Sequence, residues 1–126
     1  MSGNITDLKA LFEAFNRHDA DAAVSFMTDD VVFDTLGGSE VYGTRITGRD
    51  AVRDAFAGVW ESFHDAHWET TSHRLDGDFA VSEWIFRGTD SDGSRIEAEG
   101  VDLFTLKDGK IAMKRAFRKQ RPPIPA

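Results

Sequence analysis

The chain has 126 residues and no cysteine, and its formal net charge is −7. This length corresponds to one domain, and the lack of cysteine excludes disulfide bonds, a cysteine nucleophile and a thiolate metal site. The acidic balance argues against a nucleic-acid partner, because phosphate binding needs a broad basic face. No apolar run approaches the ~20 residues of a membrane span, and residues 1–4 lack the basic and apolar segments of a signal peptide. We therefore expect a cytoplasmic protein with neither a nucleic-acid nor a membrane partner.

The first third of the chain is expected to form two helices and a short strand. Apolar residues recur at helical spacing over residues 5–15, and Asn4 can cap this helix, with an acid three residues further on. Asp19 can cap a short second helix over residues 20–27. The apolar run at residues 31–33 is typical of a strand.

A loop and a third helix are expected next. Residues 35–49 contain four glycines, which predicts a loop with a short strand near Tyr42. The segment that begins at Thr47, Thr-Gly-Arg-Asp, has the pattern of a helix cap with an acid at the third position. The apolar face of the helix that follows consists of Val52, Phe56, Val59, Trp60 and Phe63.

The second half of the chain is expected to form an antiparallel meander. Asp-Gly pairs lie at three joins between alternating segments, and this dipeptide is the strongest short-range hairpin signal. Helices followed by an antiparallel sheet predict an α+β domain over residues 1–121. The proline-rich tail, residues 122–126, can hold neither a helix nor a central strand. The four predicted strands are residues 66–75, 79–90, 94–106 and 110–120.

Asp102 lies in the middle of the third strand of this meander. Both faces of that strand are largely apolar, so its carboxylate is expected to be at least partly buried. A buried carboxylate must be paired, hydrogen-bonded or protonated, and such a group is a candidate for a functional site. A structural ion pair is the other interpretation.

The last hairpin offers Asp102 one of two cations. A three-residue loop with a bulge at Gly109 would put Lys114 opposite Asp102 and Ala112 opposite Phe104. A two-residue turn would put Arg115 opposite Asp102 instead. Both alternatives pair the acid with a base.

Large aromatic side chains are spaced two residues apart on the meander. Trp84 and Phe86 share a face, and such rings either fill a core or line a cavity. Depending on the first turn, Trp68 or Glu69 falls opposite Trp84, and we favour Trp68 inside, because Glu69 would have no compensating partner there. The number of rings predicts a ligand cavity of about a few hundred Å³ or more. No metal is expected, because the spacing of His64 and His67 fits no standard ligand set.

Three segments carry a resemblance to a known family. Residues 16–30, NRHDADAAVSFMTDD, resemble the helix pair that opens the nuclear transport factor 2-like superfamily. Residues 47–56, TGRDAVRDAF, resemble its third helix, and residues 100–111, GVDLFTLKDGKI, resemble its last hairpin. Within the superfamily the chain is most similar to the SnoaL-like branch, the relatives of the polyketide cyclases, and its layout is similar to that of the steroid delta-isomerases.

This resemblance implies a cone, in which a curved antiparallel sheet wraps three N-terminal helices around a deep apolar pocket. Members of the superfamily include isomerases, cyclases, dehydratases, epoxide hydrolases and non-catalytic binding subunits. Most need no cofactor, so none is expected here. Many are dimers that pack through the outer face of the sheet.

The catalytic groups of the isomerases match this chain only in part. Their oxyanion-hole aspartate matches Asp102, while their base falls at Thr35, next to Asp34, which a local bulge would bring inward. Their tyrosine falls at Leu11, which cannot donate a hydrogen bond. The resemblance also implies pocket positions at Trp84, Phe86, Ala116 and Arg118.

Two functions follow from these observations. In the first, the chain is an enzyme that isomerises, cyclises, dehydrates or hydrolyses a small apolar molecule bearing a carbonyl or hydroxyl group. Asp102 is then the acid, base or polarising group, Lys114 orients it, and Asp34 is a further catalytic candidate. In the second, the chain is a non-catalytic ligand-binding or dimer-scaffold domain with a structural ion pair. The candidate pocket residues are Phe15, Phe33, Tyr42, Trp60, Trp68, Trp84, Phe86, Phe104, Ala116 and Arg118.

The outer face of the sheet is expected to be apolar if Asp102 faces inward. A monomer would expose this patch, which monomers of soluble proteins rarely do, so a two-fold homodimer through the sheet is expected. The patch would contain Ile85, Val101, Leu103, Thr105, Ile111, Met113 and Phe117, next to Glu83.

Overall fold

Three helices form in the first half of the chain. A computed structural model describes residues 4–126, so the first three residues, on which the expectation about a signal peptide partly rests, lie outside the described part. The helices are α1 (Ile5–Asn16), α2 (Ala20–Val24) and α3 (Arg49–Ser62).

Two of the three predicted helix caps are confirmed. The Asn4 side chain accepts a hydrogen bond from the backbone N–H of Asp7, whose carboxylate accepts one from the backbone of Asn4, so α1 begins with a capping box. The Asp19 carboxylate accepts a backbone N–H in the first turn of α2. The cap predicted at Thr47 is wrong, because the N-cap of α3 is Gly48, which has no side chain to accept a hydrogen bond. Its φ of 97° is one that glycine adopts without steric cost.

A six-stranded sheet follows the order β2-β1-β6-β5-β4-β3. The strands β3 to β6 form the predicted antiparallel meander, with an Asp-Gly pair within or next to each of its turns. The short strand predicted near Tyr42 is displaced to β2. The strands are β1 (Met27–Asp34), β2 (Arg45–Thr47), β3 (His67–Asp76), β4 (Phe79–Thr89), β5 (Arg95–Lys107) and β6 (Lys110–Arg118).

The first strand differs from its prediction in length and in pairing. β1 begins at Met27, before the apolar run at residues 31–33 that predicted it. The residues between them include the exposed Asp29 and Asp30, which interrupt any apolar pattern. It lies parallel to β6, where Phe33 is the partner of Lys114. The sheet is therefore antiparallel except at this pair.

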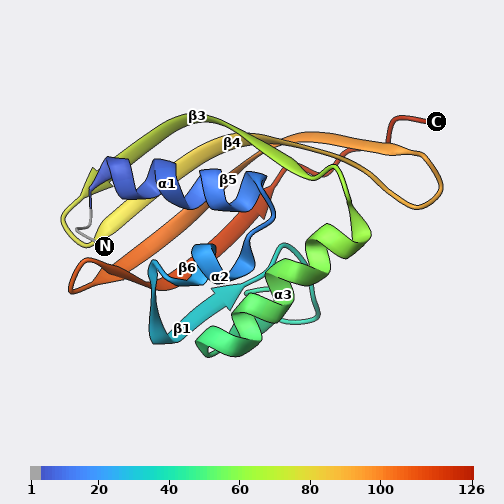
Figure 1. Cartoon of the computed structure of the whole chain (residues 1–126). Helices are drawn as coiled ribbons and strands as arrows, with labels where there is room; N and C mark the ends of the chain where they lie inside the picture. Colours follow the sequence, from blue (N-terminus) through green and yellow to red (C-terminus); the bar gives the residue numbers. More distant parts are fainter. Residues whose placement is uncertain (1–3) are drawn as a thin grey trace.

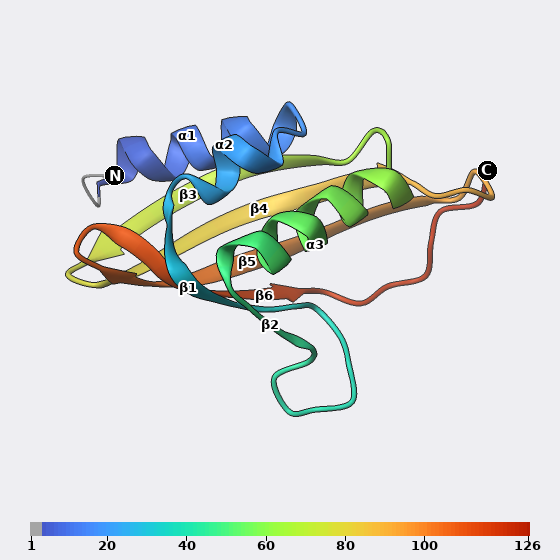
Figure 2. The ribbon, with the colours of Figure 1, turned by 60° about the horizontal axis from the view of Figure 1, so that its bottom comes forward.

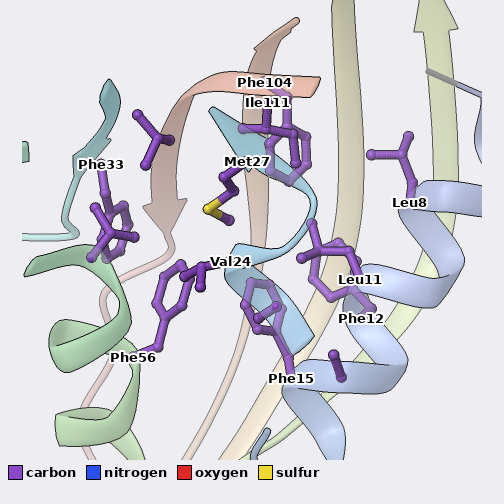
Figure 3. Close-up of a cluster of buried hydrophobic side chains, with 14 of the residues drawn as sticks. Leu8, Leu11, Phe12, Phe15, Val24, Met27, Phe33, Phe56, Phe104 and Ile111 are labelled. Carbon is purple, nitrogen blue, oxygen red and sulfur yellow. The ribbon is translucent and has the colours of Figure 1, made fainter. Parts of the chain in front are cut away.

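The helices all lie on one face of the curved sheet and leave the other face open (Figures 1 and 2). Helix α1 lies over β3, and α3 lies beside β1. This is the predicted α+β arrangement, with a curved sheet around three helices. Between the two layers lies an apolar cluster that includes Leu8, Leu11, Phe12, Phe15, Val24, Met27, Phe33, Phe56, Phe104 and Ile111 (Figure 3).

The turn between β5 and β6 holds two residues. Asp108 and Gly109 both have positive φ, at 52° and 79°, which is the requirement of a type I′ hairpin turn. A bulge follows, in which Ala112 is an extra residue on β6. Because of the turn and the bulge together, Ala116 lies opposite Asp102, and both predicted registers are wrong.

The bulge at Ala112 decides which face each side chain of β6 takes. Side chains alternate along a strand, so an extra residue reverses the alternation beyond it. Ile111 and Lys114, three residues apart, therefore both point to the helices and are buried. The expectation that Ile111 lies on the outer face is wrong for this reason.

A second bulge, at Thr71, interrupts β3. Beyond it Thr70 lies opposite Trp84, and Trp68 lies opposite Phe86. The rings of Trp68 and Phe86 are in contact, with centroids 5.1 Å apart. The inward orientation of Trp68 is therefore confirmed, whereas its predicted partner is wrong.

The chain end forms no helix, as expected from its prolines. Ile124 makes one isolated bridge to Arg95 at the start of β5. Within residues 4–126, none of the helices is long and apolar enough to cross a membrane.

Candidate active site

An ion pair lies under the helices, between β5 and β6. Asp102 is 1% exposed and Lys114 is 6% exposed. The Lys114 Nζ donates to Asp102 Oδ1 at 2.9 Å, and the Trp84 Nε1–H donates to Oδ2 at 3.2 Å. The predicted pairing is confirmed, although the lysine reaches the acid diagonally. Both carboxylate oxygens are thus occupied within the protein.

The other side of the Lys114 ammonium faces aromatic rings. Its Nζ lies 4.6 Å from the ring centre of Phe33, 5.6 Å from that of Phe15 and 5.9 Å from that of Phe56. A cation within about 6 Å of a ring face is attracted by its quadrupole. The three phenylalanines come from α1, β1 and α3, and Figure 3 shows their side chains in the core between these elements. Among the described residues, Nζ has Asp102 as its one hydrogen-bond acceptor.

A cavity of about 50 Å³ opens beside this ammonium. Lys114 is the charged residue in its wall. Trp60, also in the wall, has a buried Nε1–H without an acceptor among residues 4–126. The polar side-chain atoms of the wall are therefore hydrogen-bond donors. The lining residues are Phe15, Phe33, Phe56, Val59, Trp60, Trp68 and Lys114.

The cavity is far smaller than the few hundred Å³ predicted. The aromatic side chains of β4 and β5 that were expected to line it are packed closely: Phe104 is fully buried, and Trp84 is 3% exposed. Trp84 lies directly over Gly100, which lacks a side chain at that point. These rings therefore fill the core.

The structure brings five of the predicted site residues to the cavity and places the others elsewhere. Phe15, Phe33, Trp60, Trp68 and Lys114 line it. Asp102 lies behind Lys114, and the remaining positions of β4, β5 and β6 pack beneath or beyond the cavity: Trp84, Phe86, Phe104, Ala116 and Arg118. Phe56 and Val59 were not among the candidates, although both lie on the predicted apolar face of α3.

A comparison with family models matches residues 8–113 to the SnoaL-like domain. The chain belongs to the SnoaL-like domain family. A comparison with curated proteins finds no match. The expectation drawn from the three resembling segments is confirmed at the level of the family.

Solved structures share the fold of this SnoaL-like domain. A putative SnoaL-like polyketide cyclase from Jannaschia sp. CCS1 is 19% identical, with a TM-score of 0.80 over 93% of this chain and 85% of that chain. A putative polyketide cyclase from Xanthomonas campestris pv. campestris is 24% identical, with a TM-score of 0.78 over 89% and 87% of the two chains. The epoxide hydrolase/cyclase-like enzyme SalBIII, described for pyran ring formation in the polyether salinomycin, is 24% identical, with a TM-score of 0.75 over 90% and 88%. At these identities the likeness shows the fold.

Asp34 of this SnoaL-like domain does not reach the cavity. It follows Phe33 on β1, so its side chain lies on the opposite face. There the Arg45 guanidinium donates Nε to Oδ1 at 2.8 Å and Nη2 to Oδ2 at 3.0 Å, and Arg45 lies 4.0 Å from the ring centre of Tyr42. Thr35 does not line the cavity either, and its hydroxyl donates to the Gly37 carbonyl. Asp34, Thr35 and Tyr42 are therefore placed outside the candidate active site.

We expect Asp34 to make the stability of the SnoaL-like domain depend on pH. The hydrogen bonds from Arg45 hold the pKa of Asp34 below its ordinary value, and the charges of Arg45 and Arg115 act in the same direction against burial. The unfolded pKa is about 3.9, so this stabilisation is present above that pH and is lost as the pH falls through the lower folded pKa. We expect Asp34→Asn to flatten the fall in unfolding free energy below about pH 4. Urea unfolding from pH 2.5 to 7 measures it.

The control for that experiment is Asp30→Asn, which alters an exposed carboxylate on the same strand. It should leave the pH profile of the unfolding free energy unchanged. An equal flattening in both variants would show that the effect comes from total charge and not from the contact with Arg45.

The described residues contain no cluster of three or more histidine or acidic side chains that could hold a metal ion. The cavity wall itself carries one ammonium, aromatic rings and a valine. Such a wall can hold an apolar molecule and donate a hydrogen bond to one of its oxygen atoms. It can also stabilise negative charge that develops on that oxygen during a reaction.

Proposed function

We propose that this SnoaL-like domain binds a small apolar molecule bearing a carbonyl or hydroxyl group and rearranges it by cofactor-independent acid–base chemistry of the cyclase type. The observation that carries this proposal is the buried Lys114 ammonium in the wall of an aromatic cavity. Its Nζ would donate to the ligand oxygen, while Asp102 holds the ammonium in place and balances its charge. This reverses the roles expected from the sequence, where Asp102 acted and Lys114 oriented it.

A ligand larger than a water molecule needs a wider cavity. The helix α3 contributes Val59 and Trp60 to the wall. Moving Trp60 breaks no hydrogen bond of its indole N–H, because that group has no acceptor within residues 4–126. We therefore expect the side chains of α3 to move and widen the cavity when a ligand binds. Two neighbours with the same fold are described as putative polyketide cyclases and a third as a cyclase-like enzyme in pyran ring formation, which supports a substrate that undergoes ring formation.

A second candidate is a non-catalytic ligand-binding domain. The observation in its favour is that no carboxylate or imidazole among the described residues lines the cavity. Lys114 can polarise a carbonyl, but a base that takes up a carbon-bound proton must then come from solvent or from the ligand itself. The two candidates differ in turnover and not in binding.

The bicyclic ketone 1-tetralone distinguishes these candidates. We expect it to change the tryptophan fluorescence, since Trp60 and Trp68 line the cavity, and the protein to accelerate exchange of its α-protons in D₂O, followed by NMR. Loss of one oxyanion donor costs about 10²–10³ in rate. The variant Lys114→Met, combined with Asp102→Leu to remove the unpaired acid, should lose roughly that factor. Lys119→Met, an exposed cation just after β6, is the matched control.

Three outcomes are informative. Binding with exchange that depends on Lys114 supports the enzyme. Binding without exchange supports the non-catalytic candidate. No binding of 1-tetralone contradicts both, because the cavity would then accept no apolar carbonyl compound.

We also propose that two copies pair through the open face of the sheet. Phe117 is 47% exposed there, and it neighbours Val101 across the strands. Leu103→Glu should dissociate such a dimer, as measured by sedimentation at micromolar concentration. Val41→Glu, which places the same charge on a fully exposed loop residue, should not. Sedimentation of the unaltered chain as a monomer would contradict the pairing.

A further inference from the structure

Arg118 is a second cation on the inner face of β6. Lys114, Ala116 and Arg118 follow one another at spacing two, so they share a face. The Arg118 guanidinium lies 5.1 Å from the ring centre of Phe86, which is 2% exposed. Arg118 therefore points toward the helices and is partly withdrawn from solvent.

Arg118 has no acid partner among the described residues. By contrast, Lys114 is paired with Asp102, and Arg87 is paired with two glutamates. Burial lowers the pKa of Arg118, and no carboxylate contributes an opposing effect. Burying a charge without a partner costs free energy. A partly buried guanidinium without a carboxylate partner is suited to bind the anionic group of a ligand.

The position of Arg118 relates it to the cavity. Phe86, beneath the guanidinium, is in ring contact with Trp68, which lines the cavity. Arg118 is thus one ring beyond the cavity wall. Arg118 follows Lys114 by four positions along the strand, which is roughly 13 Å at 3.3 Å per residue. A molecule of two or three rings can span the two cations.

We propose that Arg118 binds a carboxylate of the ligand, so that apolar carboxylates bind more tightly than neutral molecules of the same shape. The ring system would lie against Phe86 and reach into the cavity, with its second oxygen group at Lys114. This inference rests on the proposed ligand cavity and adds the charge of its ligand. Lys114 is neutralised by Asp102 and suits an uncharged oxygen, whereas Arg118 is free to neutralise a full negative charge.

A purely structural role makes a different prediction. The aliphatic part of an arginine can cover an aromatic ring while the charge does nothing. Arg118→Met keeps an aliphatic side chain over Phe86 and removes the charge. Arg118→Lys keeps the charge and loses the planar guanidinium, so it should retain part of the selectivity.

The probes are 2-naphthoate and 2-naphthamide, which have nearly the same shape and differ in charge. We expect the unaltered protein to bind 2-naphthoate at least tenfold more tightly than 2-naphthamide, as measured by calorimetry or tryptophan fluorescence. In Arg118→Met the two dissociation constants should become equal, with that of 2-naphthamide unchanged. Lys119→Met, the adjacent exposed cation, should retain the preference.

Each contrary outcome has a separate meaning. If 2-naphthamide binds and 2-naphthoate binds no more tightly, Arg118 is not a carboxylate site, while the proposed cavity stands. If Arg118→Met weakens the binding of both probes equally, or leaves the preference for 2-naphthoate intact, Arg118 does not bind the carboxylate, while the proposed cavity stands. If neither probe binds, the proposed ligand cavity fails, and this inference fails with it.

Discussion

Replacing Lys114 by methionine is expected to lower the free energy of unfolding by about 3–5 kcal/mol. The substitution keeps most of the side-chain volume but leaves the Asp102 carboxylate, 1% exposed, without its cation. The Trp84 N–H alone cannot replace an ammonium as a partner for a buried charge. Urea or guanidinium unfolding at neutral pH measures the loss.

The double variant Lys114→Met with Asp102→Leu tests the cause of that loss. Replacing a buried ion pair by apolar residues of similar size is often neutral or stabilising. The double variant should therefore recover most of the lost unfolding free energy. It should remain below the unaltered protein by about 1–3 kcal/mol, because the Trp84 N–H loses its acceptor. Lys119→Met should change stability by no more than about 0.5 kcal/mol. A Lys114→Met variant as stable as the unaltered protein would show that the ion pair contributes nothing to the fold.

Replacing Gly100 by alanine is expected to destabilise the fold by about 1–3 kcal/mol. A methyl group at this position would lie against the Trp84 ring and 2.5 Å from the backbone carbonyl oxygen of Phe117. Neither neighbour can move easily, because Trp84 is 3% exposed and the carbonyl belongs to β6. Chemical denaturation and the near-ultraviolet circular dichroism of the tryptophans would report the change.

Gly58→Ala is the matched control. Gly58 lies within α3, and a methyl group there meets nothing within 4 Å. Alanine is the better helix former, so this variant should gain about 0.5–1 kcal/mol. In a Trp84→Phe background the cost of Gly100→Ala should shrink, because the smaller ring leaves room. An equal cost in both backgrounds would place the clash at the backbone of Phe117 alone.

Much of the fold follows from local sequence signals. Asn4 and Asp19 are side-chain caps that act within one turn of helix, and the Asp-Gly pairs mark turns whose φ angles only a few residues adopt. Such signals involve near neighbours and can be recognised in the sequence. The pairing of β1 with β6 joins distant segments in parallel, and no local pattern predicts it.

The site was predictable in its chemistry and not in its geometry. A lone acid in an apolar strand implied a buried cation, and Lys114 is that cation. Which of the two faces the cavity depends on register, and one extra residue at Ala112 changes it. The partner of Asp34 is Arg45, on the far side of a glycine-rich loop. The conformation of that loop does not follow from its sequence, because glycine can adopt many backbone conformations. The cavity volume depends on side-chain packing throughout the core, which no single segment determines.

The bulge in β6 lets the inner face of this strand change without any change in side-chain identity. Removing Ala112, the extra residue, would leave the partners of its neighbours unchanged and keep Lys114 and Arg118 facing the helices. If Ala112 instead took a regular place in the ladder, Lys114 and Arg118 would turn to the open face, and Met113 and Phe117 would lie beneath the helices. Homologous proteins that differ only in whether the bulge is present can therefore exchange a cationic interior for an apolar one without a substitution at any lining position.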